Sequence, residues 1–118
     1  MYDDTGITLI TCSGISNTGK LTSKVGEGII RRCPGLIECC LSARCDPDRL
    51  RLALSEAEKI MVLDGCTDCC GRKKVQEHGH DADIHLIATE NGIVKNGMEE
   101  PRFDEIEHLT VIIRDKIR

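Results

Sequence analysis

Aromatic side chains are nearly absent from this chain, which has no Trp, one Tyr and one Phe among its 118 residues. The core must therefore be built from Ile, Leu, Val and Ala. No uninterrupted run of about 18 apolar residues occurs, so we predict no transmembrane helix. An excess of basic residues is also missing, because the net charge is −4. The sequence therefore gives no electrostatic reason to expect nucleic acid or an anionic membrane as a partner.

The length of the chain is typical of one compact domain, and we expect residues 1–118 to form a single domain. Residues 1–4 are polar and acidic, which does not fit the start of a secretory signal. We therefore expect a cytoplasmic location, where thiols stay reduced. In that compartment cysteines serve as metal ligands or catalysts more often than as disulfide partners.

Cysteine is the residue that the chain has in abundance, with eight copies. Three of them lie in residues 64–70, between the apolar run 60–63 and the amphipathic run 71–78. This layout predicts a buried strand, a sharp turn at Gly65 and the first turn of a helix. The free amides and the dipole of a helix N-terminus stabilise thiolates. On that helix Cys66 and Cys70, or alternatively Cys66 and Cys69 with C-x-x-C spacing, could close on one metal ion.

Short apolar runs alternate with amphipathic stretches along the whole chain. This alternation favours an α/β three-layer sandwich, with a four-stranded, mainly parallel sheet of the Rossmann or flavodoxin-like kind in the order 2-1-3-4. The segments are strands at 7–11, 36–41, 60–63 and 83–88, helices at 20–32, from 46–47 onward, at 71–78 and from 104 onward, and a small hairpin within 89–102.

The predicted topology brings distant cysteines together. Cys12, Cys40 and Cys66 each follow or end a predicted strand, and the carboxyl ends of parallel strands share one edge of the sheet. Cys70 adds a fourth sulfur one helical turn after Cys66. Such edges are where open α/β folds bind ligands, so we expect these cysteines to form a site there.

The residues of this edge resemble a known family. Cys12-Ser13-Gly14, residues 40–43 and Asp64-Gly65-Cys66-x-x-x-Cys70 are similar to the DGC-domain family of zinc-binding proteins, named for its Asp-Gly-Cys triplet. The similarity runs along nearly the whole chain. It implies a bound metal, with ligands at the matching positions Cys12, Cys40, Cys66 and Cys70, and it names no reaction.

Four further cysteines have no counterpart in that pattern: Cys33, Cys39, Cys45 and Cys69. Cys69 is next to Cys70, so either could be the fourth ligand. Strand alternation aims Cys39 and Cys40 at opposite faces of the sheet. Cys45 could reach the ligand-binding edge from the loop in which it lies.

Four thiolates suit tetrahedral zinc, with an iron–sulfur cluster as the alternative. A closed four-sulfur site would be structural, whereas a site with one distant sulfur could bind a substrate, a small anion or a second thiol. The function indicated is a small metal-binding protein with no reaction assigned. The alternative is a thiol-based redox or metal-transfer catalyst, or an iron–sulfur carrier, that uses the same cysteines.

Two other motifs allow different interpretations. Gly14-x-x-x-x-Gly19-Lys20 has P-loop spacing, but Leu21 stands where a magnesium-binding hydroxyl belongs, so we expect a loop that catches at most a small anion. Residues 78–81 contain two histidines, which we expect in a solvated turn at the opposite edge of the sheet. His85, within a predicted strand, is expected to be packed.

Overall fold

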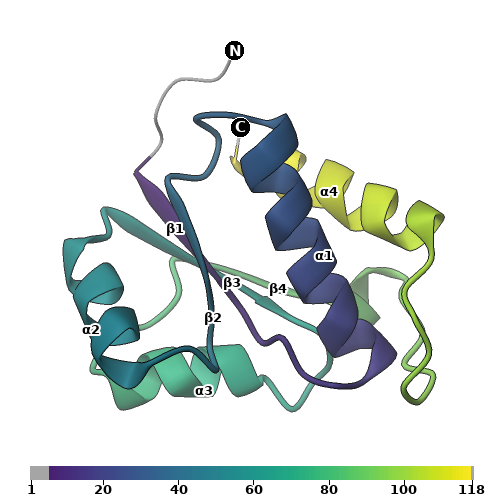
Figure 1. Cartoon of the computed structure of the whole chain (residues 1–118), viewed down its shortest axis with the longest axis horizontal. Helices are drawn as coiled ribbons and strands as arrows, with labels where there is room; N and C mark the ends of the chain where they lie inside the picture. The colour runs from purple at the N-terminus through teal and green to yellow at the C-terminus, as the bar shows by residue number, and fades with distance from the viewer. Residues whose placement is uncertain (1–5, 118) are drawn as a thin grey trace.

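The computed structural model describes residues 6–117. Residues 1–4, whose composition argued against a secretory signal, lie outside this range. Strands and helices alternate as predicted (Figure 1): β1 (Ile7–Thr11), α1 (Asn17–Arg32), β2 (Cys39–Ser42), α2 (Pro47–Glu56), β3 (Lys59–Asp64), α3 (Cys70–Glu77), β4 (Ile84–Ile87), the 3-10 helix η1 (Ala88–Asn91) and α4 (Phe103–Ile117). Within the described range no helix combines the length and the apolar character needed to cross a bilayer.

The sheet has four parallel strands in the order β2-β1-β3-β4, which confirms the predicted topology. β1 lies at the centre, so that Leu9 pairs with Cys40 of β2 on one side and with Met61 of β3 on the other. Because β1 and β3 are covered on both faces, every residue of β1 and residues 60–64 of β3 are buried, and apolar and polar residues do not alternate strictly along them.

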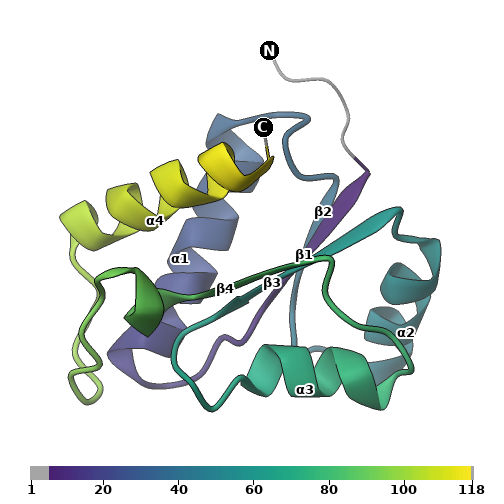
Figure 2. The ribbon, with the colours of Figure 1, turned by 180° about the vertical axis from the view of Figure 1, so that it is seen from behind.

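Helices cover both faces of the sheet: α1 and α4 lie on one side, and α2 and α3 on the other (Figures 1 and 2). Successive strand residues point to opposite faces, so β1 and β3 supply side chains to two cores. The first core contains Leu9 and Met61 with the buried stripes of α1 and α4 (Leu21, Val25, Ile29, Leu109 and Ile113). The second contains Ile10 and Val62 with Leu50, Leu54 and Val75 of α2 and α3.

Two element boundaries differ from the predicted ones for local reasons. α1 begins at Asn17 rather than at residue 20, because the Ser16 hydroxyl accepts the Gly19 amide at 3.1 Å and caps the helix. β2 begins at Cys39 rather than at residue 36. Leu36 and Ile37 lie before the strand, in and just after a turn, and are buried in the α1-side core, so their apolar character reflects packing.

The prediction of a hairpin within residues 89–102 is wrong: this segment contains the end of η1 and turns, and no strand. Its backbone pairs with α1 instead of with itself. The Asn17 side chain donates to the Val94 carbonyl at 2.8 Å and accepts the Asn96 amide at 2.6 Å. The segment is thereby anchored beside the start of α1.

The start of α4 is capped from within the helix, although Asp104-x-x-Glu107 has the spacing of a capping box. The Glu105 carboxylate accepts the Arg102 amide at 2.8 Å, two positions earlier along the chain than the pair 104/107. This is the back-reaching half of a capping box, in which the third helical residue satisfies a free amide before the helix.

The approach of α1 to β2 depends on one glycine. A Cβ atom built on Gly26 would lie 2.7 Å from the Cys40 sulfur and 3.3 Å from the Thr11 methyl group. Two residues further along the same helix, a Cβ on Gly28 would meet nothing within 4 Å. Gly26 therefore permits close packing, whereas Gly28 has no such role.

We predict that Gly26→Ala lowers the free energy of unfolding by about 1–3 kcal/mol, as expected for overpacking. Gly28→Ala is the matched control and should raise it by about 0.5–1 kcal/mol, since alanine restricts the unfolded chain more than glycine does. Urea denaturation of both variants measures the difference. Equal effects of the two substitutions would contradict the observed packing of α1 on β2.

Candidate metal site

A cavity of about 680 Å³ lies at the carboxyl ends of the strands. Its walls come from the loops after β1, β2 and β3, the facing sides of α2 and α3, and Lys95. Four of the cysteines line it: Cys12, Cys45, Cys66 and Cys70. Three of these, Cys12, Cys66 and Cys70, are among the cysteines predicted to converge at this edge. All eight cysteines of the chain are free thiols.

Cys12 is held at the inner end of the cavity by tight packing of two turns. It follows β1 directly and is buried, and its sulfur accepts the Gly65 amide at 3.3 Å. A Cβ atom on Gly65 would lie 2.7 Å from the Thr18 carbonyl carbon. Only glycine therefore allows the turn after β3 to rest on the start of α1 and to fix the Cys12 sulfur there.

Cys66 and Cys70 reach the same cavity by a different route from the one predicted. Cys66 is not on a helix: it lies in a turn closed by the Cys69 amide and the Cys66 carbonyl at 3.2 Å, and α3 begins only at Cys70. Cys66 and Cys70 are therefore not one turn apart on a helix, as predicted, although both residues line the cavity. The Lys95 ammonium lies 3.5 Å from the Cys66 sulfur.

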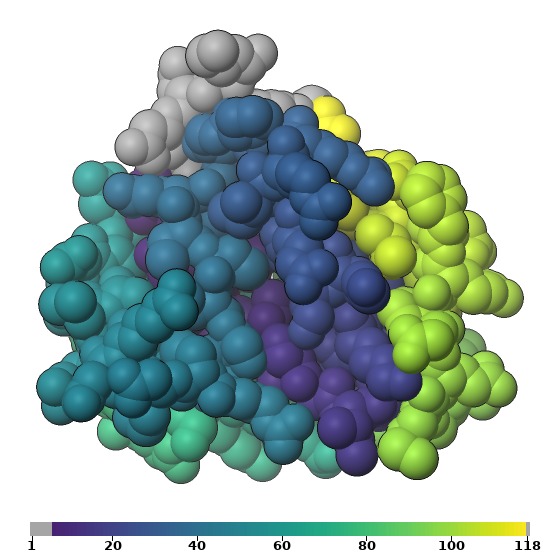
Figure 3. Space-filling model, in the orientation of Figure 1, coloured from purple at the N-terminus to yellow at the C-terminus, as the bar shows by residue number. Residues whose placement is uncertain are grey.

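Cys40 lies elsewhere. It is the second residue of β2, which continues to Ser42, and it lines a separate groove of about 450 Å³ beside Gly26 and Glu27 of α1. Atoms of the β1 segment form the bottom of this groove between β2 and α1 (Figure 3). Cys45, in the loop after β2, lines the large cavity instead. The opposite orientation of Cys39, which packs in the α2-side core, confirms the expected strand alternation.

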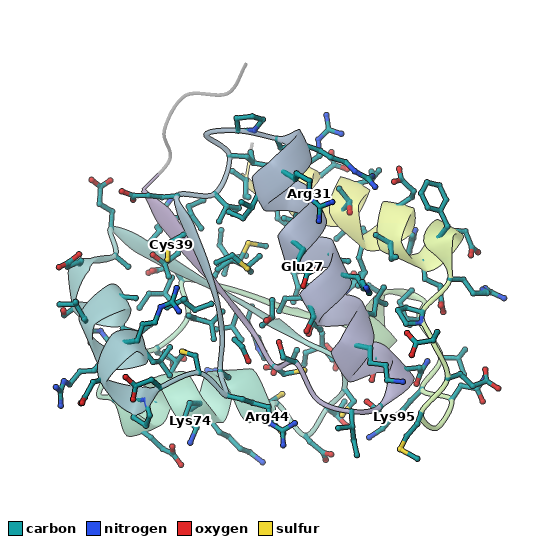
Figure 4. All side chains as sticks on the ribbon, viewed as in Figure 1. Glu27, Arg31, Cys39, Arg44, Lys74 and Lys95 are labelled. Atoms are coloured by element: carbon teal, nitrogen blue, oxygen red, sulfur yellow. The ribbon has the colours of Figure 1, made fainter. Side chains whose placement is uncertain are left out.

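Basic side chains surround the mouth of the large cavity. Arg44, Lys74 and Lys95 line it and lie along the carboxyl-end side of the molecule (Figure 4). Lys95 is 4.0 Å from Asp68, and Lys74 is 3.2 Å from Glu77. The three cations outnumber Asp68, the carboxylate that also lines the cavity, so the charge of the rim is positive on balance and favours anionic ligands.

His78 also lines this cavity, because the cavity extends along α3 to the end of that helix. The expected turn is present at residues 78–79, and His78 in it reaches the cavity that the cysteines line. Arg72 and Asp81 form an exposed ion pair nearby, which holds the Asp81 pKa down at about 2, chiefly through the hydrogen bond from Arg72.

A second group of potential ligands was missed by the sequence analysis. Asp64, Cys69 and His85 each contribute one ligand atom to a group in which all three atoms lie within 4.8 Å of one another. Residues 6–117 contain no other group of three or more His, Cys, Asp or Glu side chains whose ligand atoms are this close. The four cavity sulfurs are thus farther apart in any set of three. The register could have indicated part of the group, because His85 pairs with Val62 and so shares its sheet face with Asp64.

Asp64 organises this group. Its buried carboxylate accepts the Gly71 amide at 2.7 Å and the Arg72 amide at 3.3 Å, so it caps the first turn of α3. Its second oxygen lies 2.7 Å from His85 Nε2. Because an ionised carboxylate can only accept, Nε2 carries the proton of this hydrogen bond.

Cys69 has an unusual backbone at the start of α3. Its φ of 53° and ψ of 45° are left-handed, whereas a residue at the N-cap is normally extended. Such a conformation costs a non-glycine residue about 1–3 kcal/mol. Burial, followed by the negative charge of Asp64, raises the pKa of the Cys69 thiol, with Lys73 and Arg72 acting in the opposite direction.

Fold and site together define a three-layer α/β protein with a thiol-lined cavity at the carboxyl edge of its sheet. The family model of the DGC domain matches residues 8–113. The chain therefore belongs to the DGC domain family. The searches of curated proteins and of solved structures found no match to this chain.

The position of Cys40 leads to a pH-dependent prediction for chelator-treated protein. Burial, with smaller contributions from Cys39 and Glu27, raises the pKa of the Cys40 thiol from 9.0 to about 11. As the pH rises, the Cys40 thiol ionises in the unfolded chain before it ionises in the folded protein, and this favours unfolding. The contribution of the buried neutral thiol to the free energy of unfolding is therefore complete below pH 9 and is lost as the pH rises to 11.

We expect the free energy of unfolding of the unmodified chain to fall over this interval by up to about 3 kcal/mol more than that of Cys40→Ala. Urea denaturation at several pH values between 8 and 11 measures the two slopes. Parallel curves for the two proteins would mean that the Cys40 thiol titrates normally and is not buried beneath α1.

Proposed function

We propose that this chain is a small metal-binding protein that holds zinc through thiolates at the carboxyl edge of its sheet. The observation that carries the proposal is the shared cavity of Cys12, Cys66 and Cys70, which come from two segments far apart in sequence. Free cysteines that serve only as small apolar residues pack within the core. Three that line one accessible cavity are better explained as ligands.

The donor set fits a soft or borderline ion. Thiolates favour zinc and iron–sulfur clusters over magnesium or calcium. Zinc needs no inorganic sulfide and accepts three or four sulfurs in a tetrahedral arrangement, so it is the metal that we propose, with an iron–sulfur cluster as the alternative. Cys12 is fixed, whereas Cys66 lies in a turn and Cys70 is exposed, so these two side chains can close on an ion.

The fourth ligand has two candidates. Family resemblance indicates Cys40, and this stays a prediction, because Cys40 lines the groove under α1 and must leave it to reach the cavity. Geometry favours Cys45, which lines the cavity with the other three sulfurs. We therefore propose Cys12, Cys66 and Cys70 as ligands in either case, with Cys45 as the fourth.

A second candidate function is the transfer of a metal ion to or from an anionic thiol compound. It is favoured by the size of the cavity, about 680 Å³, which exceeds that of a bare ion, and by its rim of Arg44, Lys74 and Lys95. A ligand whose carboxylate or phosphate contacts this rim could supply a sulfur to the same ion. Both functions require reduced thiols, so we propose a cytoplasmic location. We also propose that residues 1–118 act as one domain.

Serine substitutions test the ligand set. We expect Cys12→Ser, Cys66→Ser and Cys70→Ser each to weaken zinc binding by more than the roughly 10–100-fold that loss of an outer-shell partner costs. Cys33→Ser is the control, because Cys33 follows the far end of α1, and it should bind zinc normally. Competition with a zinc chelator gives the affinities. Normal binding by Cys70→Ser would contradict the proposal.

The same measurement identifies the fourth ligand. Loss of affinity in Cys45→Ser with normal binding in Cys40→Ser assigns it to Cys45. The opposite pattern assigns it to Cys40 and means that β2 or α1 rearranges when the metal binds.

Metal removal provides a separate test. Cys66 and Cys70 should resist alkylation by iodoacetamide in zinc-loaded protein and react readily after chelation, because a metal-bound thiolate is masked. Mass spectrometry of the peptides that contain them gives the rates, with Cys39 as the internal reference outside the cavity. Rates that do not change on chelation would show that neither residue binds the metal.

A further inference from the structure

Cys69 and Cys70 are neighbours in sequence but belong to different groups in space. Cys70 lines the thiol cavity together with Cys66, whereas Cys69 is not among the residues that line it. The sulfur of Cys69 instead lies within 4.8 Å of ligand atoms of Asp64 and His85. The site proposed above therefore leaves Cys69 without a role and does not use the Asp64–His85 pair.

The spacing of these three side chains fits a metal ion. In a tetrahedral zinc site with bonds of 2.0–2.3 Å, neighbouring ligand atoms are roughly 3.3–3.8 Å apart. Ligand atoms that already lie within 4.8 Å need only small side-chain rotations to reach such distances. If His85 binds the ion through Nε2, the proton that Nε2 donates to Asp64 is released to solvent and this hydrogen bond is replaced by the two bonds to the metal. Carboxylate oxygen, thiolate sulfur and imidazole nitrogen are all common zinc ligands.

The charge of the group also favours a cation. The Asp64 carboxylate is only 1% exposed, and within residues 6–117 its ion-pair partner is His85 rather than a Lys or Arg side chain. Two amides and one imidazole donate to it, which leaves part of its capacity of about four hydrogen bonds unused. These hydrogen bonds and the N-terminus of α3 stabilise the carboxylate without supplying a full positive charge, and a bound cation would supply one.

The backbone of Cys69 gives a reason for the unusual start of α3. Its left-handed conformation, with φ of 53°, turns two consecutive side chains to different sites: Cys69 to the Asp64–His85 pair and Cys70 to the cavity. Glycine would adopt this conformation without strain but would supply no ligand. Cysteine at this position is therefore explained by its sulfur.

We propose that Asp64, Cys69 and His85 form a second metal site, with mixed oxygen, sulfur and nitrogen ligands, that takes a borderline-soft divalent cation such as zinc. Three protein ligands leave one coordination position to water or to an external ligand, as in zinc sites that exchange ligands. Access is given by His85, whose side chain is 17% exposed, and by half-buried Cys69. This site shares no ligand with the thiol cavity.

Cobalt(II) is the probe for this proposal, since it substitutes for zinc and its absorption spectrum reports thiolate ligands. We expect two equivalents to bind to the reduced, unmodified chain. Cys69→Ser and His85→Gln should each bind one equivalent. Cys66→Ser is the matched control: it should lose the cavity ion and keep the mixed-ligand ion.

A glycine variant separates ligand loss from misfolding. Cys69→Gly removes the sulfur and relieves the left-handed backbone, so it should bind one cobalt fewer than the unmodified chain while its urea midpoint rises. The proposal is overturned if Cys69→Ser, Cys69→Gly and His85→Gln all keep the full stoichiometry. In that case the Asp64–His85 pair serves only to cap α3.

The two proposed sites can fail separately. A single equivalent that is lost in Cys69→Ser and kept in Cys66→Ser supports the mixed-ligand site and overturns the thiol cavity. A single equivalent with the reverse pattern supports the cavity and overturns the mixed-ligand site. Failure of the unmodified chain to bind cobalt overturns both.

Discussion

The hydrogen bonds from the start of α3 to the buried carboxylate of Asp64 connect the sheet to the candidate site. Asp64 is the last residue of β3, and it accepts the Gly71 and Arg72 amides across the turn that carries the cysteines. The same carboxylate contacts His85 of β4. Gly65 is also held by the Cys12 sulfur, so this cap is the link to the sheet at the far end of the turn, where it positions Cys69 and Cys70. The Asp of the Asp-Gly-Cys triplet therefore has a structural role that is independent of any metal.

Most of the fold could be predicted because the strands are short apolar runs separated by helices with clear apolar stripes. The strand order then followed from right-handed crossovers. The errors arose where tertiary contacts override local sequence. Leu36 and Ile37 are as apolar as strand residues but fill the core from a turn, and the segment expected to form a hairpin pairs with Asn17, far away in sequence. Neither contact leaves a local pattern in the sequence.

The candidate site was predictable to the extent that topology determines it. Parallel strands bring their carboxyl ends together, which was sufficient to expect Cys12 and Cys66 near each other. Cys40 was expected near the end of a strand at 36–41, but β2 runs from Cys39 to Ser42, so Cys40 lies near its start. The residues of this segment that line the cavity at the edge of the sheet come after Ser42. The left-handed conformation of Cys69 was not foreseeable, since propensity disfavours it for any residue with a Cβ atom. The assembly of Asp64, Cys69 and His85 follows from that conformation.

The central claim is that a metal ion binds between Cys12, Cys66 and Cys70, at the edge of the sheet. The most direct measurement is an anomalous difference map, recorded at the zinc absorption edge, from crystals of zinc-loaded protein. The account predicts a peak within bonding distance of the sulfurs of these three residues. A map of well-ordered crystals without a peak in this cavity, or with zinc bound by Cys40 under α1 instead, would contradict it.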